Sequence, residues 1–344
     1  MTVPSLTRRQ LLSLSALGAV GLLGGCGDGQ APQLLSSRGQ FPAAWLKRLP
    51  SPWQSRRLES AAAVLQAAQQ PRSALVQLGD GWAQTLGPAA LQAFEPGAAL
   101  EGLLPQSEAV SRLFRDGSRV ALPWAFGTWL LLLRSRPDLA AQPARGWGLL
   151  LDPSLKQKLV LPSSPRLVIE LALRQLGSSS ADPAALADPR LPAQLARLRC
   201  QALAFDERDG LNLLLSGRAQ AAVLPSQVVL PLLRRDLRLS ALLPSSGSPL
   251  WWNLLLVPAG EHPAPALDWL RECRSRPMLD RLLSGGWVPP LRRERLGASL
   301  ALWPKEQALL LYPEPAVLER CNSLPPLNGS ERQRYQRLWD QAAA

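Results

Sequence analysis

The chain has 344 residues, of which 47% are hydrophobic, and a formal net charge of +12. This composition excludes a wholly disordered chain, and the length fits about two domains. The basic residues are scattered, with only short pairs such as Arg234-Arg235. A nucleic-acid partner needs a basic patch, and the N-terminus predicts export, so we expect no nucleic-acid partner.

The N-terminal segment is typical of an export signal. Arg8 and Arg9 precede an apolar run, 11–23, of about 13 residues, whereas a membrane span needs about 20. A basic start, a short apolar middle and small residues at the end predict a signal peptide over residues 1–25. The arginine pair also resembles a twin-arginine export signal. A buried core helix is the alternative, which the pair and the following cysteine disfavour.

The signal ends in a sequence that resembles a lipobox, Leu23-Gly24-Gly25-Cys26. We therefore expect Cys26 to be lipidated and to become the first residue of the mature protein. Residues 26–34 are small and polar and predict a flexible linker. The protein is then expected in the periplasm, attached to the membrane by its lipid anchor.

Apolar segments and helical segments alternate after residue 73, which is typical of an α/β protein. In chain order we expect a strand running into a glycine turn at 73–82, a strand that breaks and continues at 119–135, and a strand at 157–164 with a helix behind it that ends at Gly177. We then expect a strand with a polar turn at 219–229, a strand at 249–260, and two helices at 265–290 stopped by glycines.

Three cysteines remain after Cys26, namely Cys200, Cys273 and Cys321. Their spacing does not fit a zinc site, so we expect buried free thiols, with one disulfide as the alternative. We expect no metal and no cofactor.

Nothing in the sequence predicts catalysis. The only histidine is His262, and the chain has no nucleophile elbow, phosphate loop or H-E-x-x-H pair. Asp206, Glu207 and Asp209 cluster before a helix, where a solvated cap is expected rather than an acid/base pair. We therefore predict no catalytic residue and no enzyme.

Four blocks of the chain resemble the extracellular solute-binding proteins of ABC transporters, in particular the spermidine/putrescine-binding type. The blocks are residues 120–177, with the turn Trp147-Gly148-Leu149-Leu150-Leu151-Asp152-Pro153, and residues 211–227, 249–260 and 266–290. Their order and spacing extend the resemblance over most of residues 75–290.

The resemblance implies an α/β fold of the two-lobe type II periplasmic binding protein class, with a ligand cleft between the lobes. The N-lobe would comprise 35–126 and 254–300, and the C-lobe 127–253 and 301–344. Gly127 and Pro258 would lie at or next to the two crossings.

The implied function is that of a monomeric solute-binding protein that captures a small solute, polyamine-like by family, and delivers it to an ABC transporter permease. The alternative is a non-transporting lipoprotein with a degenerate binding fold that acts as scaffold or sensor. A cleft blocked by Trp252 or Leu167 would favour the alternative.

A polyamine site needs carboxylates for the ammonium groups and aromatic faces for the stem. The residues expected to bind ligand are Asp80, Trp82, Trp124, Thr128, Trp129, Ser164, Arg166, Ser226, Trp251 and Asn253. Several of these residues have an alternative role that is not ligand binding. For each tryptophan the alternative is packing in the core, for Asp80 it is a role in the turn, and for Arg166 it is a solvated position at the start of a helix.

The family's acidic residues are only partly present. Asn253 stands where the family has an aspartate that holds an amine, and Ser163, Ser164 and Leu167 replace three acids. A neutral or zwitterionic solute therefore stays open, as does an anion held by Arg166. A tyrosine-rich iron site is not expected, because the only two tyrosines lie in the C-terminal tail.

Overall fold

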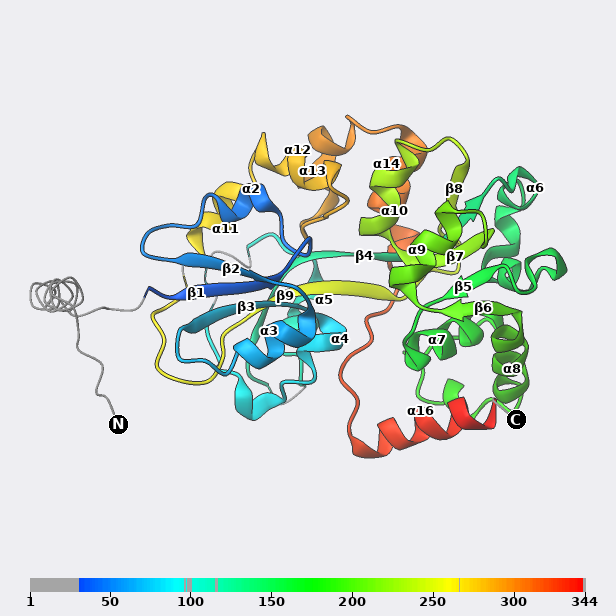
Figure 1. Ribbon diagram of the computed structural model, residues 1–344, viewed down its shortest axis with the longest axis horizontal. Coiled ribbons are helices and arrows are strands. Elements are labelled where there is room, and N and C mark those ends of the chain that lie inside the picture. Colours follow the sequence, from blue (N-terminus) through cyan, green and yellow to red (C-terminus); the bar gives the residue numbers. More distant parts are fainter. Residues whose placement is uncertain (1–30, 96, 98–100, 115–116, 266, 343–344) are drawn as a thin grey trace, which may run out of the picture. The chain divides into compact units, whose positions relative to one another are not determined.

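The structure is a computed structural model that describes residues 31–342 except 96, 98–100, 115–116 and 266 (Figure 1). The predicted signal peptide and Cys26 lie outside the described residues. The first strand begins at Gln33, so the last two residues of the predicted linker belong to the sheet. Within the described ranges, no helix combines the length and the apolar character that crossing a membrane requires.

Within the described residues, nine strands form one mixed sheet with the order β2-β1-β3-β9-β4-β7-β5-β6, in which β8 also pairs with β4. The strands are β1 (Gln33–Ser37), β2 (Gln54–Leu58), β3 (Ser73–Gly79), β4 (Ala121–Arg134), β5 (Leu159–Leu161), β6 (Ala202–Phe205), β7 (Ala221–Pro225), β8 (Leu239–Leu242) and β9 (Leu250–Leu256). The outer strands pair in parallel, whereas β9 and β4 run antiparallel to their neighbours and to each other.

Helices connect and cover the strands. They are α2 (Ala43–Leu46), α3 (Ala61–Ala67), α4 (Asp80–Ala83), α5 (Pro105–Ser111), α6 (Pro137–Ala140), α7 (Pro165–Gln175), α8 (Leu191–Gln201), α9 (Glu207–Leu215), α10 (Ser226–Leu233), α11 (Asp268–Cys273), α12 (Met278–Ser284), α13 (Arg293–Leu300), α14 (Lys305–Leu311), α15 (Pro315–Leu318) and α16 (Gly329–Gln341). Alternation of strands and helices confirms the predicted α/β class.

The long strand β4 joins two groups of strands, as Figure 1 shows. Its second half is Leu-rich, and alternate side chains enter different cores because successive residues of a strand face opposite ways. Leu131 and Leu133 pack with Trp147, whereas Leu130 and Leu132 pack on the other face. Burial on both faces explains why this segment reads as one continuous apolar run.

Three local expectations change in detail. The segment 119–135 forms one strand with a register shift between Pro123 and Ala125, not two pieces, because a proline has no N–H for the ladder. The polar turn expected after β7 is the helix α10. The turn expected after β3 is the first turn of α4.

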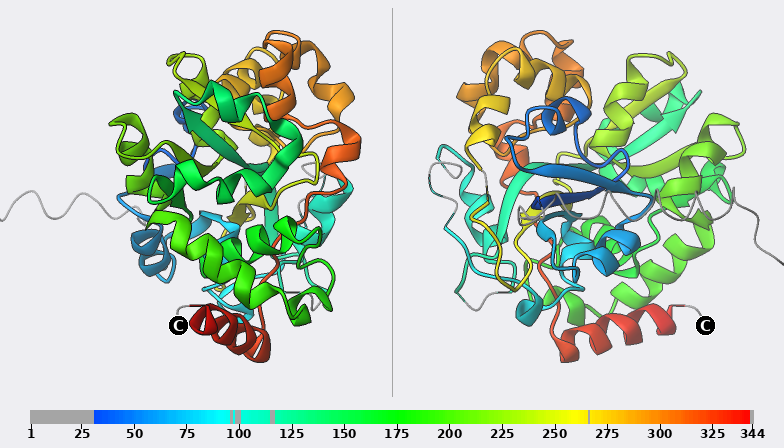
Figure 2. Two further views of the ribbon diagram at one scale, coloured as in Figure 1. Left: turned by 90° about the vertical axis from the view of Figure 1, so that its right-hand side faces the viewer. Right: turned by 60° about the vertical axis from the view of Figure 1, so that its left-hand side comes forward.

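The chain after residue 300 contributes to more than one core. Trp303 and Tyr312 pack in the cluster that contains Phe126 and Trp252. The last helix, α16, packs against α7 and α8 through Tyr335, and Figure 2 shows it in red beside the green helices.

The cysteines only partly match the prediction. Cys273 and Cys321 are buried free thiols, and burial raises the pKa of both, that of Cys273 to about 11. Cys200 is also free but exposed. Across the part of the chain that the structure describes, no disulfide is formed.

Candidate functional site

A cavity of about 620 Å³ opens where three strands end. β1 ends at Ser37, β3 at Gly79 and β7 at Pro225, and all three residues line it. Loops beyond the carboxyl ends of the strands are the usual ligand position in open α/β sheets. The full lining is Ser37, Arg38, Gln40, Glu59, Ser60, Ala61, Gln77, Leu78, Gly79, Asp80, Trp82, Trp129, Glu207, Leu211, Pro225, Gln227, Val228, Trp251, Trp252 and Asn253.

Asp80 is the first residue of α4 and is partly buried at the end of β3. Burial raises the pKa of its carboxyl to about 6, while the backbone N–H groups of Gly81 and Trp252 and the charge of Arg166 act in the opposite direction. The Gly81 N–H donates to Asp80 Oδ1 at 3.0 Å. The carboxylate is therefore mostly ionised at neutral pH, yet poorly solvated, and a cation beside it would restore the lost stabilisation.

Two further acids line the same cavity. Glu207 begins α9, and its Oε2 accepts the N–H of Ser163 at 2.7 Å. Glu59 lies 2.9 Å from Arg38 Nη2, and both of these side chains are largely exposed. Asp206, Glu207 and Asp209 were expected to form a solvated helix cap. In the structure Asp206 caps the helix, because its Oδ1 accepts the Asp209 N–H at 3.1 Å, whereas Glu207 lines the cavity.

A chain of amides crosses the cavity wall. Gln77 Nε2 donates to Asn253 Oδ1 at 2.8 Å, and Asn253 Nδ2 donates to Gln227 Oε1 at 3.4 Å. Gln227 Nε2 in turn faces Gln40 Oε1 at 3.4 Å. The chain holds Asn253, which is almost fully buried, in a fixed orientation and gives the wall neutral donors and acceptors.

Four tryptophans surround the cavity with different exposure. Trp82 is 46% exposed, whereas Trp251 and Trp252 are buried and Trp129 is intermediate. Trp252 stacks on Phe126 with ring centroids 5.4 Å apart, and its Nε1 donates to Ser323 Oγ at 2.8 Å. Rings fixed from behind in this way present rigid apolar faces to the cavity.

Gly127 provides room for one of these rings. A Cβ atom built at Gly127 would lie 2.6 Å from Cζ2 of Trp251 and 2.3 Å from Oγ of Ser226. Trp251 could not keep its position against a larger residue at this point in β4.

We predict that Gly127→Ala displaces Trp251 and destabilises the protein by about 1–3 kcal/mol, as overpacking of a core does. Chemical denaturation monitored by tryptophan fluorescence measures this loss in the free energy of unfolding. Gly148→Ala is the matched control, because a Cβ at Gly148 meets nothing within 4 Å. Equal stability of the Gly127→Ala and Gly148→Ala variants would contradict the tight contact.

The structure brings together five of the ten residues expected to bind ligand. Those that line the cavity are Asp80, Trp82, Trp129, Trp251 and Asn253. Ser164 lies exposed just before α7. Thr128 and Ser226 are buried and do not line the cavity.

Trp124 lies in an aromatic core and not at the cavity. It is fully buried, with ring centroids 4.6 Å from Phe41 and 5.1 Å from Trp287. Trp45 and Trp269 complete this cluster. Trp124 is therefore a core residue, which was the alternative to ligand binding. The tryptophans of this chain are divided between the core and the cavity.

Arg166 is held by the C-terminal segment. Its Nη1 donates to the carbonyl oxygens of Leu324 and Pro325 at 3.2 and 2.5 Å, and the guanidinium lies 5.6 Å from the Tyr335 ring centroid. Burial lowers the pKa of Arg166. It acts on the site only through its charge, which lowers the pKa of Asp80.

Other cavity residues were not predicted from the sequence: Gln77, Gln227, Glu207 and the Arg38–Glu59 pair. A signal was present for Gln77, since it is a long polar side chain inside the apolar strand β3. No sequence signal distinguished Gln227, Glu207, Arg38 and Glu59 from ordinary surface residues. Within the described residues, no group of histidine, cysteine and acidic side chains is arranged to hold a metal ion.

No protein-family model matches the sequence, and no curated protein is significantly similar to it. Solved structures do match. The spermidine/putrescine ABC transporter substrate-binding protein PotD from Streptococcus pneumoniae, in complex with calcium and HEPES, superposes with a TM-score of 0.73 at 16% identity, covering 91% of this chain and 98% of that chain.

Two further structures agree in fold. The TpPotD lipoprotein of Treponema pallidum has a TM-score of 0.64 at 14% identity and covers 91% of this chain and 99% of its own. MotA from A. tumefaciens B6, in complex with glucopine, has a TM-score of 0.64 at 14% identity, with 90% and 99% covered. The chain therefore has the mixed α/β fold of type II periplasmic binding proteins, as the sequence resemblance implied.

Proposed function

We propose that the protein is a periplasmic solute-binding protein that captures a small organic cation in the cavity around Asp80 and delivers it to an ABC permease. One observation carries the proposal: three carboxylates, one of them paired with Arg38, meet four tryptophans in one cavity of about 620 Å³ at the strand ends. Nothing in this arrangement supplies a nucleophile with its base, so binding and not catalysis is the role it supports.

The charges of the cavity favour an amine. Arg38 and Glu59 pair with each other, which leaves the negative charges of Asp80 and Glu207. Aromatic faces stabilise both an ammonium group and an apolar stem, and the amide of Asn253 accepts a hydrogen bond without adding charge. A diamine or polyamine meets all three conditions, which agrees with the spermidine and putrescine in the names of the structural relatives.

A cleft blocked by Trp252 or Leu167 would favour the alternative function, a scaffold or sensor with a degenerate binding fold. Trp252 lies on the wall of the cavity and leaves it open, and Leu167 does not line it. The open cavity therefore supports solute binding over a purely structural role.

Two lobes and a hinge complete the proposal. One lobe is built on β1, β3 and the core around Trp252. The other is built on β5, β6 and β7. β4 and β9 cross between them near Gly127, and closing the lobes on the ligand is the motion expected of this fold.

A thermal-shift screen of the monomeric protein with polyamines, amino acids, sugars and small anions tests the proposal. We expect a rise in melting temperature with putrescine or spermidine, because a ligand that binds only the folded state stabilises it. Stabilisation by sugars or anions alone would contradict the cationic ligand. The absence of any shift would favour the scaffold.

The lipid anchor is a separate part of the proposal. We predict that Cys26→Ser releases the protein from the membrane fraction, because lipid chains provide the attachment. Fractionation and immunoblotting measure it, with Cys200→Ser as the matched control because that thiol is free and exposed. A Cys26→Ser variant that stays with the membrane would contradict lipidation at this residue.

A further inference from the structure

A second cavity, of about 320 Å³, lies between α11, α12 and α13, the gold and orange helices of Figure 1. It shares no lining residue with the cavity around Asp80. Four arginines line it: Arg271, Arg274, Arg276 and Arg295. We call it the arginine pocket.

The positive charge of the arginine pocket is only partly compensated. Four arginines and one acid, Glu101, line it, a net charge of +3. Asp280 lies outside the lining, 2.9 Å from Arg276, and adds one negative charge beside it. Among the residues that the structure describes, neither Arg271 nor Arg295 forms an ion pair.

Two of the guanidinium groups repel each other. The pKa of Arg274 is lowered to about 10, first by burial and then by the positive charge of Arg295. Holding like charges together destabilises the empty protein, and a bound anion would remove that cost. Arg271, Arg276 and Arg295 are exposed and Arg274 is half-buried, and the convergence of like charges around the half-buried Arg274 marks a candidate site.

The backbone fixes the walls of the arginine pocket. The Leu104 N–H donates to the Pro290 carbonyl at 2.7 Å, and the Arg292 N–H donates to the Gly102 carbonyl at 3.2 Å. These bonds hold the loop with Glu101 against the start of α13. Gly102 also makes room, since a Cβ there would lie 2.5 Å from Nη1 of Arg295.

We propose that the arginine pocket binds a phosphate dianion, as free phosphate or as a phosphate monoester headgroup. Guanidinium forks match the oxygens of phosphate in geometry, and a phosphate monoester carries close to two negative charges at pH 7. That charge is opposite in sign to the net charge of the lining residues. Ser275 and Ser299 also line the pocket, but the Ser275 hydroxyl donates to the Glu272 carbonyl at 2.6 Å, so the guanidinium groups are the donors that the proposal uses.

Calorimetric titration with inorganic phosphate tests the site, using the full chain with Cys26→Ser and sodium chloride at matched ionic strength. We expect Arg295→Gln and Arg271→Gln each to weaken phosphate binding by about tenfold or more, the effect of one charge-assisted hydrogen bond. Arg281→Gln is the matched control, because it removes the same charge from neighbouring α12 but does not line the pocket. The Arg281→Gln variant should bind phosphate with the same affinity as the parent protein.

Vesicle sedimentation distinguishes the two sources of phosphate. Vesicles of phosphatidylcholine with phosphatidic acid, compared with phosphatidylcholine alone, should retain the parent and not Arg295→Gln if the headgroup is bound. Binding of phosphate in solution without vesicle binding identifies the free anion, and either result supports the pocket. Equal losses in Arg295→Gln and Arg281→Gln, or binding of neither phosphate source, would overturn the proposal.

Discussion

Asp80→Asn is expected to weaken binding of the organic cation by about 10- to 100-fold, the loss of one charge-assisted hydrogen bond worth about 1.5–3 kcal/mol. The reason is that an amide keeps the shape of the carboxyl but has no charge for an ammonium group. Titration followed by tryptophan fluorescence measures it, because four tryptophans line the cavity. Asp209→Asn is the control, since Asp209 is also acidic but lies outside this cavity.

The same substitution should stabilise the ligand-free protein. The pKa of Asp80 is raised from 3.8 to about 6 on folding, so the folded state binds the proton more tightly. This contribution to stability is complete below pH 3.8 and is lost as the pH rises to about 6. Two pKa units correspond to about 3 kcal/mol, and partial exposure reduces this to about 1–2 kcal/mol.

Asp80→Asn should therefore equal the parent in stability near pH 4 and exceed it above pH 6. Binding of the cation should weaken as the pH falls through 6, because the carboxyl becomes protonated. Urea denaturation at the two pH values, without ligand, measures the stability difference. A variant that is less stable than the parent at pH 7, or that binds the amine unchanged, would remove Asp80 from the site.

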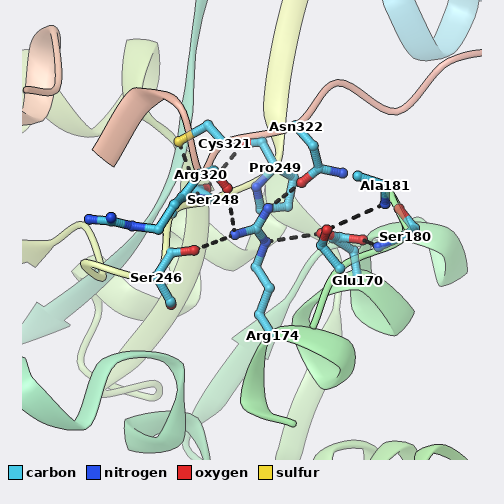
Figure 3. A network of polar contacts seen from close by, with 12 residues as sticks. Glu170, Arg174, Ser180, Ala181, Ser246, Ser248, Pro249, Arg320, Cys321 and Asn322 are labelled. Atoms are coloured by element: carbon cyan, nitrogen blue, oxygen red, sulfur yellow. Dashed lines mark hydrogen bonds and ion pairs between the residues drawn. The ribbon is translucent and has the colours of Figure 1, made fainter. Parts of the chain in front are cut away.

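The second large effect is expected at a buried ion pair on α7. Glu170 Oε1 lies 3.0 Å from Arg174 Nε, and both side chains are almost fully buried (Figure 3). Arg174 also donates to the carbonyl oxygens of Ser246 and Arg320 at 2.7 and 3.1 Å and to the side chain of Asn322. One guanidinium thus ties α7 to the segment before β9 and to the segment that precedes α16.

Arg174→Met is predicted to lower the free energy of unfolding by about 3–5 kcal/mol, because it leaves the charge of Glu170 buried without its counter-charge, with the Ser180 N–H as a remaining hydrogen-bond donor. The double variant Glu170→Leu with Arg174→Met should recover part of the loss, since it removes that charge. Denaturation curves of the single and double variants measure both effects.

Arg190→Met is the control for the ion pair. Arg190 pairs with Asp188 at 2.7 Å, but its side chain is 66% exposed, and exposed pairs contribute about 0–1 kcal/mol. Equal losses in Arg174→Met and Arg190→Met would show that the buried pair does not hold the segments together.

Much of the fold could be predicted because its core segments carry their pattern in the chain. The runs that became β3, β4 and β9 are mostly apolar and are buried on both faces, and Gly177 follows its helix with a φ of +80°. The short helices α4 and α10 could not be predicted in the same way. Each begins at a strand end, where a turn and a first helical turn have the same sequence signals.

The site was harder to predict than the fold, because a cavity is formed by residues distant in sequence. Gln77 and Asn253 contact each other across 176 positions. Trp124 and Trp251 look alike in the sequence, yet only their packing partners separate the core residue from the cavity residue. Glu207 resembles any acidic helix start until its approach to the strand ends is known.

A crystal structure of the protein with the amine that gives the largest thermal shift tests the central claim most directly. We predict an ammonium nitrogen about 3 Å from the carboxylate of Asp80, with the ligand stem against Trp82 and Trp251. A ligand bound outside this cavity, or inside it with no nitrogen near Asp80 or Glu207, would contradict the account.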